Sequence, residues 1–247
     1  IIVKIAKFAK REFNHKNLCL SGGVALNCVA NGKLLKSELF ENIWIQPSSG
    51  DAGCSLGAAL CIWHNYLDKK RNIDPQKDSM KGSYLGPSFT NIEINNFLKL
   101  NEFIYSFYED NALFEILSKY LNEGHVIGLF QGKMEFGPRA LGNRSIIGDP
   151  RIEDMQRKLN LKIKFRESFR PFAPSVMKEY QKEYFDIDED SPYMLLVGNI
   201  NDKKKLSINE FNLSMNERLN LKRSEIPSVT HVDYSARVHT VTEESNN

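Results

Sequence analysis

The pattern of apolar and polar positions in the first quarter of the chain predicts two strand–loop–helix units. In the first, an apolar strand at residues 17–20 is followed by a Ser-Gly-Gly turn and a helix over residues 24–35. The second has a strand at 43–45, a loop rich in glycine and serine at 47–53 and a helix at 55–67. Two such units in succession predict an α/β sheet that binds ligand at the carboxyl ends of its strands.

The residues on either side of these units are also informative. Before them, apolar residues at positions 1, 2, 5, 8 and 9 with lysines between them predict an amphipathic helix. The sequence starts inside this helix and without a Met, so we expect the chain to be a piece of a longer protein. After them, the polar residues 68–83 show no periodicity and predict a surface connection or a domain boundary.

A second region follows residue 83. Its expected elements are helices at 92–100, 112–121 and 151–164, strands at 125–131 and 193–197, and strand character over 228–241. The prolines of FRPFAPSVM predict extended backbone at 169–177. Residues 199–226, rich in Asn, Lys and Ser, predict a long loop or a disordered insertion.

Composition limits the class of protein. With 41% hydrophobic and 26% charged residues and a net charge of +2, the chain is typical of globular proteins and has no overall attraction to nucleic acid or membrane. No apolar run approaches the roughly 18 residues of a membrane helix. The cysteines lack zinc-ligand spacing and predict buried, reduced thiols, which indicates a cytoplasmic protein; they are Cys19, Cys28, Cys54 and Cys61.

The Ser21-Gly22-Gly23 turn places backbone N–H groups beside the start of a helix. Such a place favours phosphate or another anion, because the amides and the helix dipole both attract negative charge. Asn27, one helical turn further on, would face the same ligand. The alternative is a tight turn whose glycines serve packing, and the residues alone do not separate the two.

Asp51 lies between glycines in PSSGDAG, at the carboxyl end of the second strand. A carboxylate there suits a divalent metal or a ribose hydroxyl. It also suits the N-cap of the following helix. The residues alone favour the cap.

Cationic side chains gather in three glycine-, proline- and phenylalanine-rich segments. They are Lys133, Arg139 and Arg144, then Lys162, Lys164, Arg166 and Arg170, and finally Arg237. Guanidinium groups match phosphate and carboxylate in a two-point geometry, which favours an anion site. The alternative is a set of structural ion pairs with Glu135, Asp149 and Glu167. For His231 and Asp233, two residues apart on an expected strand, a structural role is favoured because further metal ligands are missing.

Five segments in this order resemble the NodU-type O-carbamoyltransferases, over about residues 1–245. They are LCLSGGVALNCVANGKLL, PSSGDAGCSLGAAL, GKMEFGPRALGNRSIIGDPR, IKFRESFRPFAPSV and THVDYSARVHTV. The first two are shared with actin-like sugar kinases and with the tRNA threonylcarbamoyl-adenosine transferase, whereas the third and fourth are more specific. The resemblance implies a fold of mixed α/β and α+β class. Residues 1–84 would be the C-terminal lobe of an actin-like ATPase (ribonuclease H-like) domain, and 85–247 part of a YrdC-like domain.

The resemblance also implies roles for individual residues. Ser21, Gly22, Gly23, Asn27, Gly50 and Gly53 would bind adenylate, and Asp51 would bind a divalent metal (Mg or Fe), which reverses the preference for a cap. Catalytic roles would fall to Lys164, Arg166, Arg170 and Arg237. The phosphates of carbamoyl phosphate and ATP would be held by Lys133, Arg139 and Arg144.

The expected function is transfer of a carbamoyl group from carbamoyl phosphate, through carbamoyl adenylate made with ATP, to a hydroxyl of a sugar, antibiotic or polysaccharide precursor. A homodimer is a further expectation. The family's His-x-x-x-His metal pair is missing, and Tyr234 stands where glycine usually precedes Ser-Ala-Arg. We therefore expect this chain alone to be inactive in full transfer. The alternatives are a tRNA threonylcarbamoyl-adenosine-type enzyme and a non-catalytic nucleotide-binding module.

Overall fold

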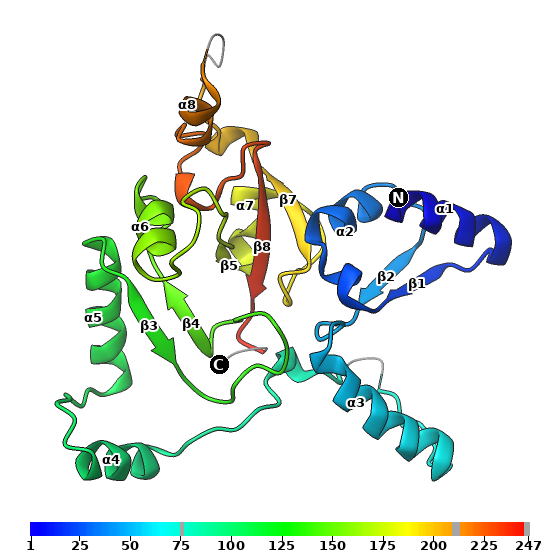
Figure 1. Cartoon of the computed structure of the whole chain (residues 1–247), viewed down its shortest axis with the longest axis horizontal. Helices are drawn as coiled ribbons and strands as arrows, with labels where there is room; N and C mark the ends of the chain where they lie inside the picture. The colour runs from blue at the N-terminus through cyan, green and yellow to red at the C-terminus, as the bar shows by residue number, and fades with distance from the viewer. Residues whose placement is uncertain (75–76, 209–212, 245–247) are drawn as a thin grey trace.

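The two predicted units at the N-terminus form a parallel strand pair flanked by helices. In the computed structural model, which describes residues 1–74, 77–208 and 213–244, β1 (Asn17–Leu20) pairs in parallel with β2 (Asn42–Ile45). The helix α1 (Ile2–Phe13) precedes β1, and α2 (Cys28–Leu35) connects the two strands. Figure 1 shows these elements together, with α1 and α2 beside the strand pair. The strands predicted at 17–20 and 43–45 are both present.

The predicted helix over 24–35 is divided in two. The 3₁₀ helix η1 (Gly23–Leu26) ends before α2 begins, and the Asn27 side chain accepts a hydrogen bond from the backbone N–H of Ala30 at 3.1 Å. Asparagine is a favoured N-cap residue because its side chain satisfies an N–H that the first turn leaves unpaired. Asn27 therefore starts a new helix.

The remaining elements form two further sheets and their connecting helices. The strand β3 (Ile127–Phe130) pairs antiparallel with β4 (Arg144–Ile147). A larger sheet has the strand order β5-β8-β7-β6, with bounds Ser175–Met177, Ser235–Val241, Leu196–Ile200 and Phe185–Asp186. The other helices are α3 (Ala52–Cys61), η2 (Ile62–Tyr66), η3 (Lys81–Ser83), α4 (Asn91–Leu100), α5 (Asp110–Asn122), α6 (Met155–Lys162), η4 (Lys178–Tyr180), α7 (Gln181–Tyr184), η5 (Asp202–Lys204), α8 (Met215–Leu219) and η6 (Pro227–Val229).

The larger sheet carries the main core. Phe185, Ile200, Ala236 and Val238 are at most 2% exposed and pack with other apolar residues of this sheet. A second cluster joins the sheet to the N-terminal unit, because Ala25 and Ile45 pack against Leu195. The two regions are therefore in direct contact through the end of β7.

Several expectations need correction. Cys19, Cys54 and Cys61 are exposed and Cys28 is half-buried, so the prediction of buried thiols is wrong. Cys54 and Cys61 are exposed because they lie on α3, which projects away from the sheets and buries none of its residues (Figure 1).

The predicted loop at 199–226 instead contains the end of β7, η5, α8 and a bridge between Lys205 and Ser224, while its residues 209–212 lie outside the described part. Within residues 1–74, 77–208 and 213–244, none of the helices has the length and apolar character needed to span a bilayer.

Candidate functional site

Predicted cationic residues meet in one cavity beside the larger sheet. A cavity of about 520 Å³ lies between the segment 138–150, the segment 164–175 and β8. Its lining includes Arg139, Lys164, Arg166 and Arg237. This space, called the cationic cavity below, brings together residues from all three predicted basic segments.

Arg237 lies on β8 at the inner wall of the cationic cavity. Burial is the main factor that lowers the pKa of its guanidinium, and the positive charge of Arg139 lowers it further. Its Nε is buried and has no hydrogen-bond partner in the described part of the chain. A buried donor without an acceptor costs free energy.

Arg139 approaches from the glycine-rich segment. Its Nη2 donates a hydrogen bond to the Leu26 carbonyl at 3.0 Å, which ties it to the N-terminal unit. Its Nε, like that of Arg237, is buried without a partner among the described residues. Arg139 and Arg237 therefore each hold a buried inner N–H that has no acceptor among the described residues.

Arg166 is held by its own segment. Its Nε donates to Asn160 Oδ1 at 2.6 Å, and its guanidinium carbon lies 5.0 Å from the centroid of the Phe172 ring. These contacts fix the stem of the side chain and leave its terminal amino groups as further donors. Like Arg139, Arg166 thus has one nitrogen anchored by a hydrogen bond within the protein.

Chemically, this arrangement is suited to a small, multiply charged anion. Guanidinium and ammonium groups are donors only, and in a partly dry cavity their attraction for an anion is stronger than in water. Like charges held close together repel one another, as the lowered pKa of Arg237 indicates. A phosphate-bearing ligand would satisfy the free donors and relieve that repulsion.

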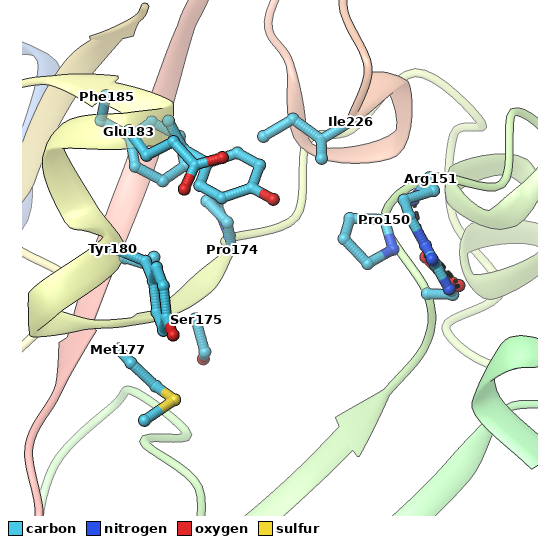
Figure 2. Close-up of a pocket in the computed structure, with 12 residues that line it drawn as sticks. Pro150, Arg151, Pro174, Ser175, Met177, Tyr180, Glu183, Phe185 and Ile226 are labelled. Carbon is cyan, nitrogen blue, oxygen red and sulfur yellow. Dashed lines mark hydrogen bonds and ion pairs between the residues drawn. The ribbon is translucent and has the colours of Figure 1, made fainter. Parts of the chain in front are cut away.

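A second cavity of about 410 Å³ shares Pro150, Pro174 and Ser175 with the cationic cavity. Figure 2 shows its walls, with Tyr180 and Glu183 on one side and Pro150 and Arg151 on the other. Arg151 is bound to Asp149, since its Nη2 lies 2.5 Å from Asp149 Oδ2. This ion pair lowers the pKa of Asp149 chiefly through the hydrogen bond from the guanidinium. The other lining residues of the second cavity are largely aromatic and apolar, so it offers such surface next to the cationic cavity.

Comparison with known protein families identifies the family of this chain. A model named Carbamoyltransferase C-terminus matches residues 118–247, and a model named Carbamoyltransferase N-terminus matches residues 1–60. The chain belongs to the carbamoyltransferase family. The family predicted from the five sequence segments is thereby confirmed.

Individual carbamoyltransferase-family relatives agree. The chain is 52% identical over its whole length to an uncharacterised Synechocystis protein, of which it covers 40%. It is 36% identical to the nodulation protein NolO of Bradyrhizobium diazoefficiens over all of this chain and 41% of NolO. It is 30% identical to the 3'-hydroxymethylcephem-O-carbamoyltransferase of Streptomyces clavuligerus over 98% of this chain and 40% of that enzyme. The chain thus spans about two fifths of the length of these relatives.

Other predicted cations of this carbamoyltransferase-family chain lie outside the cationic cavity. Arg144 forms an ion pair with Glu135, with Arg144 Nε 3.3 Å from Glu135 Oε2, and Arg170 pairs with Glu167 at 2.7 Å. Arg144 and Arg170 therefore form structural ion pairs, which was the alternative to an anion site. Lys133 and Lys162 are exposed and do not line the cavity.

The predicted adenylate residues show mainly structural contacts. Ser21, Gly22 and Gly23 are exposed at the turn after β1. Gly50 is half-buried and a Cβ added to it would lie 3.6 Å from Leu26 Cδ1, an ordinary contact. At Gly53 an added Cβ would lie 2.0 Å from the Ser48 carbonyl oxygen, so close packing alone requires glycine. Adenylate binding at this turn stays a prediction.

Asp51 precedes α3 and is exposed, but its side chain makes no capping hydrogen bond. The cap that the residues alone favoured is therefore absent. In the described part of the chain, His, Cys, Asp and Glu side chains form no group of three or more able to hold a metal ion. One carboxylate is not a site, so the residues described here do not fit the implied metal.

His231 and Asp233 belong to the turn before β8. Ser235 Oγ donates to Asp233 Oδ1 at 2.6 Å and lies 2.9 Å from His231 Nδ1. Burial lowers the pKa of His231, which keeps the ring neutral at pH 7. The favoured structural role is what the structure shows.

Two uncharged residues that matter for the cavity could not be found by searching for charge. Asn160 is completely buried and donates to the carbonyls of Ser168 and Arg170, so it shapes the segment that carries Arg166. Ser175 lines both cavities.

Proposed function

We propose that this chain forms the donor-activating part of an O-carbamoyltransferase, and that the cationic cavity binds carbamoyl phosphate together with the phosphates of ATP. The observation that carries the proposal is the meeting of Arg139, Arg166 and Arg237 in one cavity. Two of these have buried Nε atoms without an acceptor among the described residues. Family membership supplies the class of reaction.

The chemistry balances as follows. Carbamoyl phosphate, ATP and one water give carbamoyl adenylate, phosphate and pyrophosphate. Carbamate, released when phosphate leaves, attacks the α-phosphorus of ATP through an oxygen, and pyrophosphate departs. Negative charge develops on phosphate oxygens in this step, and cations already in place stabilise it without reorganisation. An acceptor hydroxyl then takes the carbamoyl group and AMP is released.

The second cavity gives room for the nucleoside of ATP. Tyr184 and Tyr180 line it and offer aromatic surface on which a base can stack. Pro150, Pro174 and Ser175 line both this cavity and the cationic cavity, so the two spaces are neighbours. On this proposal Tyr184→Ala raises the KM for ATP and leaves the affinity for carbamoyl phosphate unchanged.

Pyrophosphate release from ATP, dependent on carbamoyl phosphate, tests the proposal in the full-length protein. Arg237→Ala and Arg139→Ala are expected to lower kcat/KM by about 100-fold each, the order seen when one preorganised donor is removed. Arg157→Ala is the matched control, because Arg157 is exposed on α6 and does not line the cationic cavity. Full activity in both cavity variants would refute the assignment. ATP binding without pyrophosphate release in the wild type would favour a non-catalytic module.

The acceptor is proposed to be an alcohol. The Streptomyces clavuligerus relative is named for transfer to a hydroxymethylcephem, and NolO for nodulation. Transfer to a hydroxyl of an antibiotic or sugar precursor is the reaction class that fits both names. Incubation of the full-length protein with carbamoyl phosphate, ATP and a panel of such alcohols, followed by mass spectrometry for an added carbamoyl group (~43 Da, CONH₂ in place of H), tests this step.

A further inference from the structure

Ser175 and His239 form a hydrogen-bonded pair in the wall of the cationic cavity. In the parallel pairing of β5 with β8, Ser175 stands opposite His239, and Ser175 Oγ lies 2.9 Å from His239 Nδ1. Ser175 is exposed and lines both cavities, whereas His239 is 3% exposed. The hydroxyl therefore faces ligand space, and the imidazole lies behind it. Figure 2 shows Ser175 next to Pro174 in the wall of the second cavity.

The tautomer of His239 determines which way the hydroxyl proton points. Burial lowers the pKa of His239 to about 4, so its ring is neutral at pH 7 and carries one N–H. The ring nitrogen that faces Ser175 is Nδ1. In the tautomer with its proton on Nε2, Nδ1 is an acceptor and Ser175 donates its O–H to it.

Ser175 thereby differs from the other serines that line the cationic cavity. Ser228 donates to the Ile152 carbonyl and accepts from the Gln156 N–H, so both of its roles are filled within the protein. Ser145 accepts from the Gly142 N–H at 3.0 Å and keeps its proton to donate. With the His239 proton on Nε2, Ser175 alone of these three donates its proton within the protein and keeps an acceptor for a ligand.

This gives the cavity a side-chain acceptor beside its cationic donors. Arginine and lysine side chains can only donate, so they match the oxygens of a phosphate. They cannot recognise an N–H group. An acceptor placed beside them selects a ligand that carries both a phosphate and a neutral N–H donor.

We propose that Ser175, oriented by His239, is a specificity-determining residue that accepts a hydrogen bond from the N–H₂ of the carbamoyl group. This inference rests on the proposed function, because it assumes that carbamoyl phosphate occupies the cationic cavity. Acetyl phosphate has nearly the same shape, with a methyl group in place of the amine. With acetyl phosphate bound, the Ser175 acceptor would have no N–H to pair with. An unpaired polar group in a binding site lowers affinity. His239 acts through Ser175 and is a positioning residue.

Binding of carbamoyl phosphate and acetyl phosphate to the full-length protein, measured by calorimetry, tests the proposal. The wild type is expected to prefer carbamoyl phosphate. In Ser175→Ala the affinity for carbamoyl phosphate falls by about tenfold while that for acetyl phosphate does not fall, so the preference is lost. Ser175→Thr keeps the hydroxyl and retains the preference. Because Ser175 is exposed, its truncation leaves the fold intact.

The outcomes separate this proposal from the proposed function. If Ser175→Ala keeps the wild-type preference, or if the wild type binds the two acyl phosphates equally, the role of Ser175 is wrong. Carbamoyl-phosphate-dependent pyrophosphate release by the same samples then shows independently whether the proposed function survives. For His239, nitrogen-15 NMR of the wild type reports the tautomer: a proton on Nε2 is expected, and a proton on Nδ1 would overturn the proposed orientation of the hydroxyl.

Discussion

Glu135 and Arg144 form an ion pair whose carboxylate is completely enclosed. Arg144 Nε lies 3.3 Å from Glu135 Oε2, and the Glu135 side chain is 0% exposed. The other oxygen, Oε1, accepts backbone hydrogen bonds from Leu141 at 2.6 Å and Asn143 at 2.9 Å. One buried carboxylate thus fixes the course of the glycine-rich segment, and with it the position from which Arg139 reaches the cationic cavity.

Replacement of this carboxylate should weaken the fold and remove part of its acid sensitivity. Burial raises the pKa of Glu135, but the backbone N–H groups of Leu141, Asn143 and Arg144 outweigh it and the net pKa is lowered. A carboxylate with a lowered pKa adds stability at pH values above its unfolded-state pKa, and that stability is lost as the pH falls through its folded-state pKa. Glu135→Gln keeps one acceptor oxygen but loses the charge.

The expected cost of Glu135→Gln is about 1–3 kcal/mol in the free energy of unfolding at pH 7, the usual value for hydrogen bonds to a charged group. Urea unfolding at pH 7 and pH 4 measures it, and the difference between variant and wild type should shrink at the lower pH. Glu167→Gln is the control, since that carboxylate lies in an exposed pair with Arg170. Equal losses in the two variants would contradict the structural role of Glu135.

The sequence predicted the elements whose signals are local. The strands β1 and β2 were evident from short apolar runs, and the repeat of the unit indicated an α/β sheet. The division of one helix at Asn27 was missed, although asparagine is a known helix-starting residue. The strand β4 was missed because GNRSIIGD is too polar and glycine-rich to indicate a strand, and its pairing with β3 is a tertiary effect.

The site was predicted only in part, because the type of a residue can be read from the sequence but its folded partner cannot. Basic residue types in rigid segments indicated an anion site, and Arg139, Arg166 and Arg237 do meet in one cavity. Charge alone did not separate them from Arg144 and Arg170, because the carboxylates that pair with those two are brought there by folding. Ser175 was missed altogether. Its partner His239 is 64 positions away, and only the sheet register places the two together.

Close contact between α2 and β7 should make Gly32 irreplaceable. A Cβ added to Gly32 would lie 2.8 Å from the Val197 carbonyl oxygen, which cannot move without disturbing the sheet. We expect Gly32→Ala to lower the free energy of unfolding by about 1–3 kcal/mol, as overpacking does. Gly57→Ala is the matched control on α3, where an added Cβ meets nothing within 4 Å. Thermal unfolding of both variants should show a loss for the first and none for the second.

Arg166 and Arg170 are four residues apart, yet the structure gives them different roles. Arg166 lines the cationic cavity, whereas Arg170 does not and pairs with Glu167. Arg166→Ala should lower carbamoyl-phosphate-dependent pyrophosphate release by about 100-fold in kcat/KM. Arg170→Ala should change it by about twofold or less, because an exposed pair contributes little. The reverse order would show that Arg170, as the family resemblance implies, acts on the ligand.

The buried imidazole of His239 should make stability depend on pH in a defined window. Its pKa is lowered by burial from 6.5 to about 4, so between these values the unfolded chain binds a proton that the folded protein does not. Stability from this group is therefore complete above about pH 6.5 and falls as the pH drops toward 4, by up to about 3 kcal/mol. His239→Gln should flatten this slope in urea unfolding measured from pH 7 to pH 4. His231→Gln is the comparison, because the pKa of His231 is also lowered by burial and its removal should leave the His239 contribution in place. An unchanged slope in His239→Gln would mean that the ring is protonated in the folded protein, and would remove the acceptor that orients Ser175.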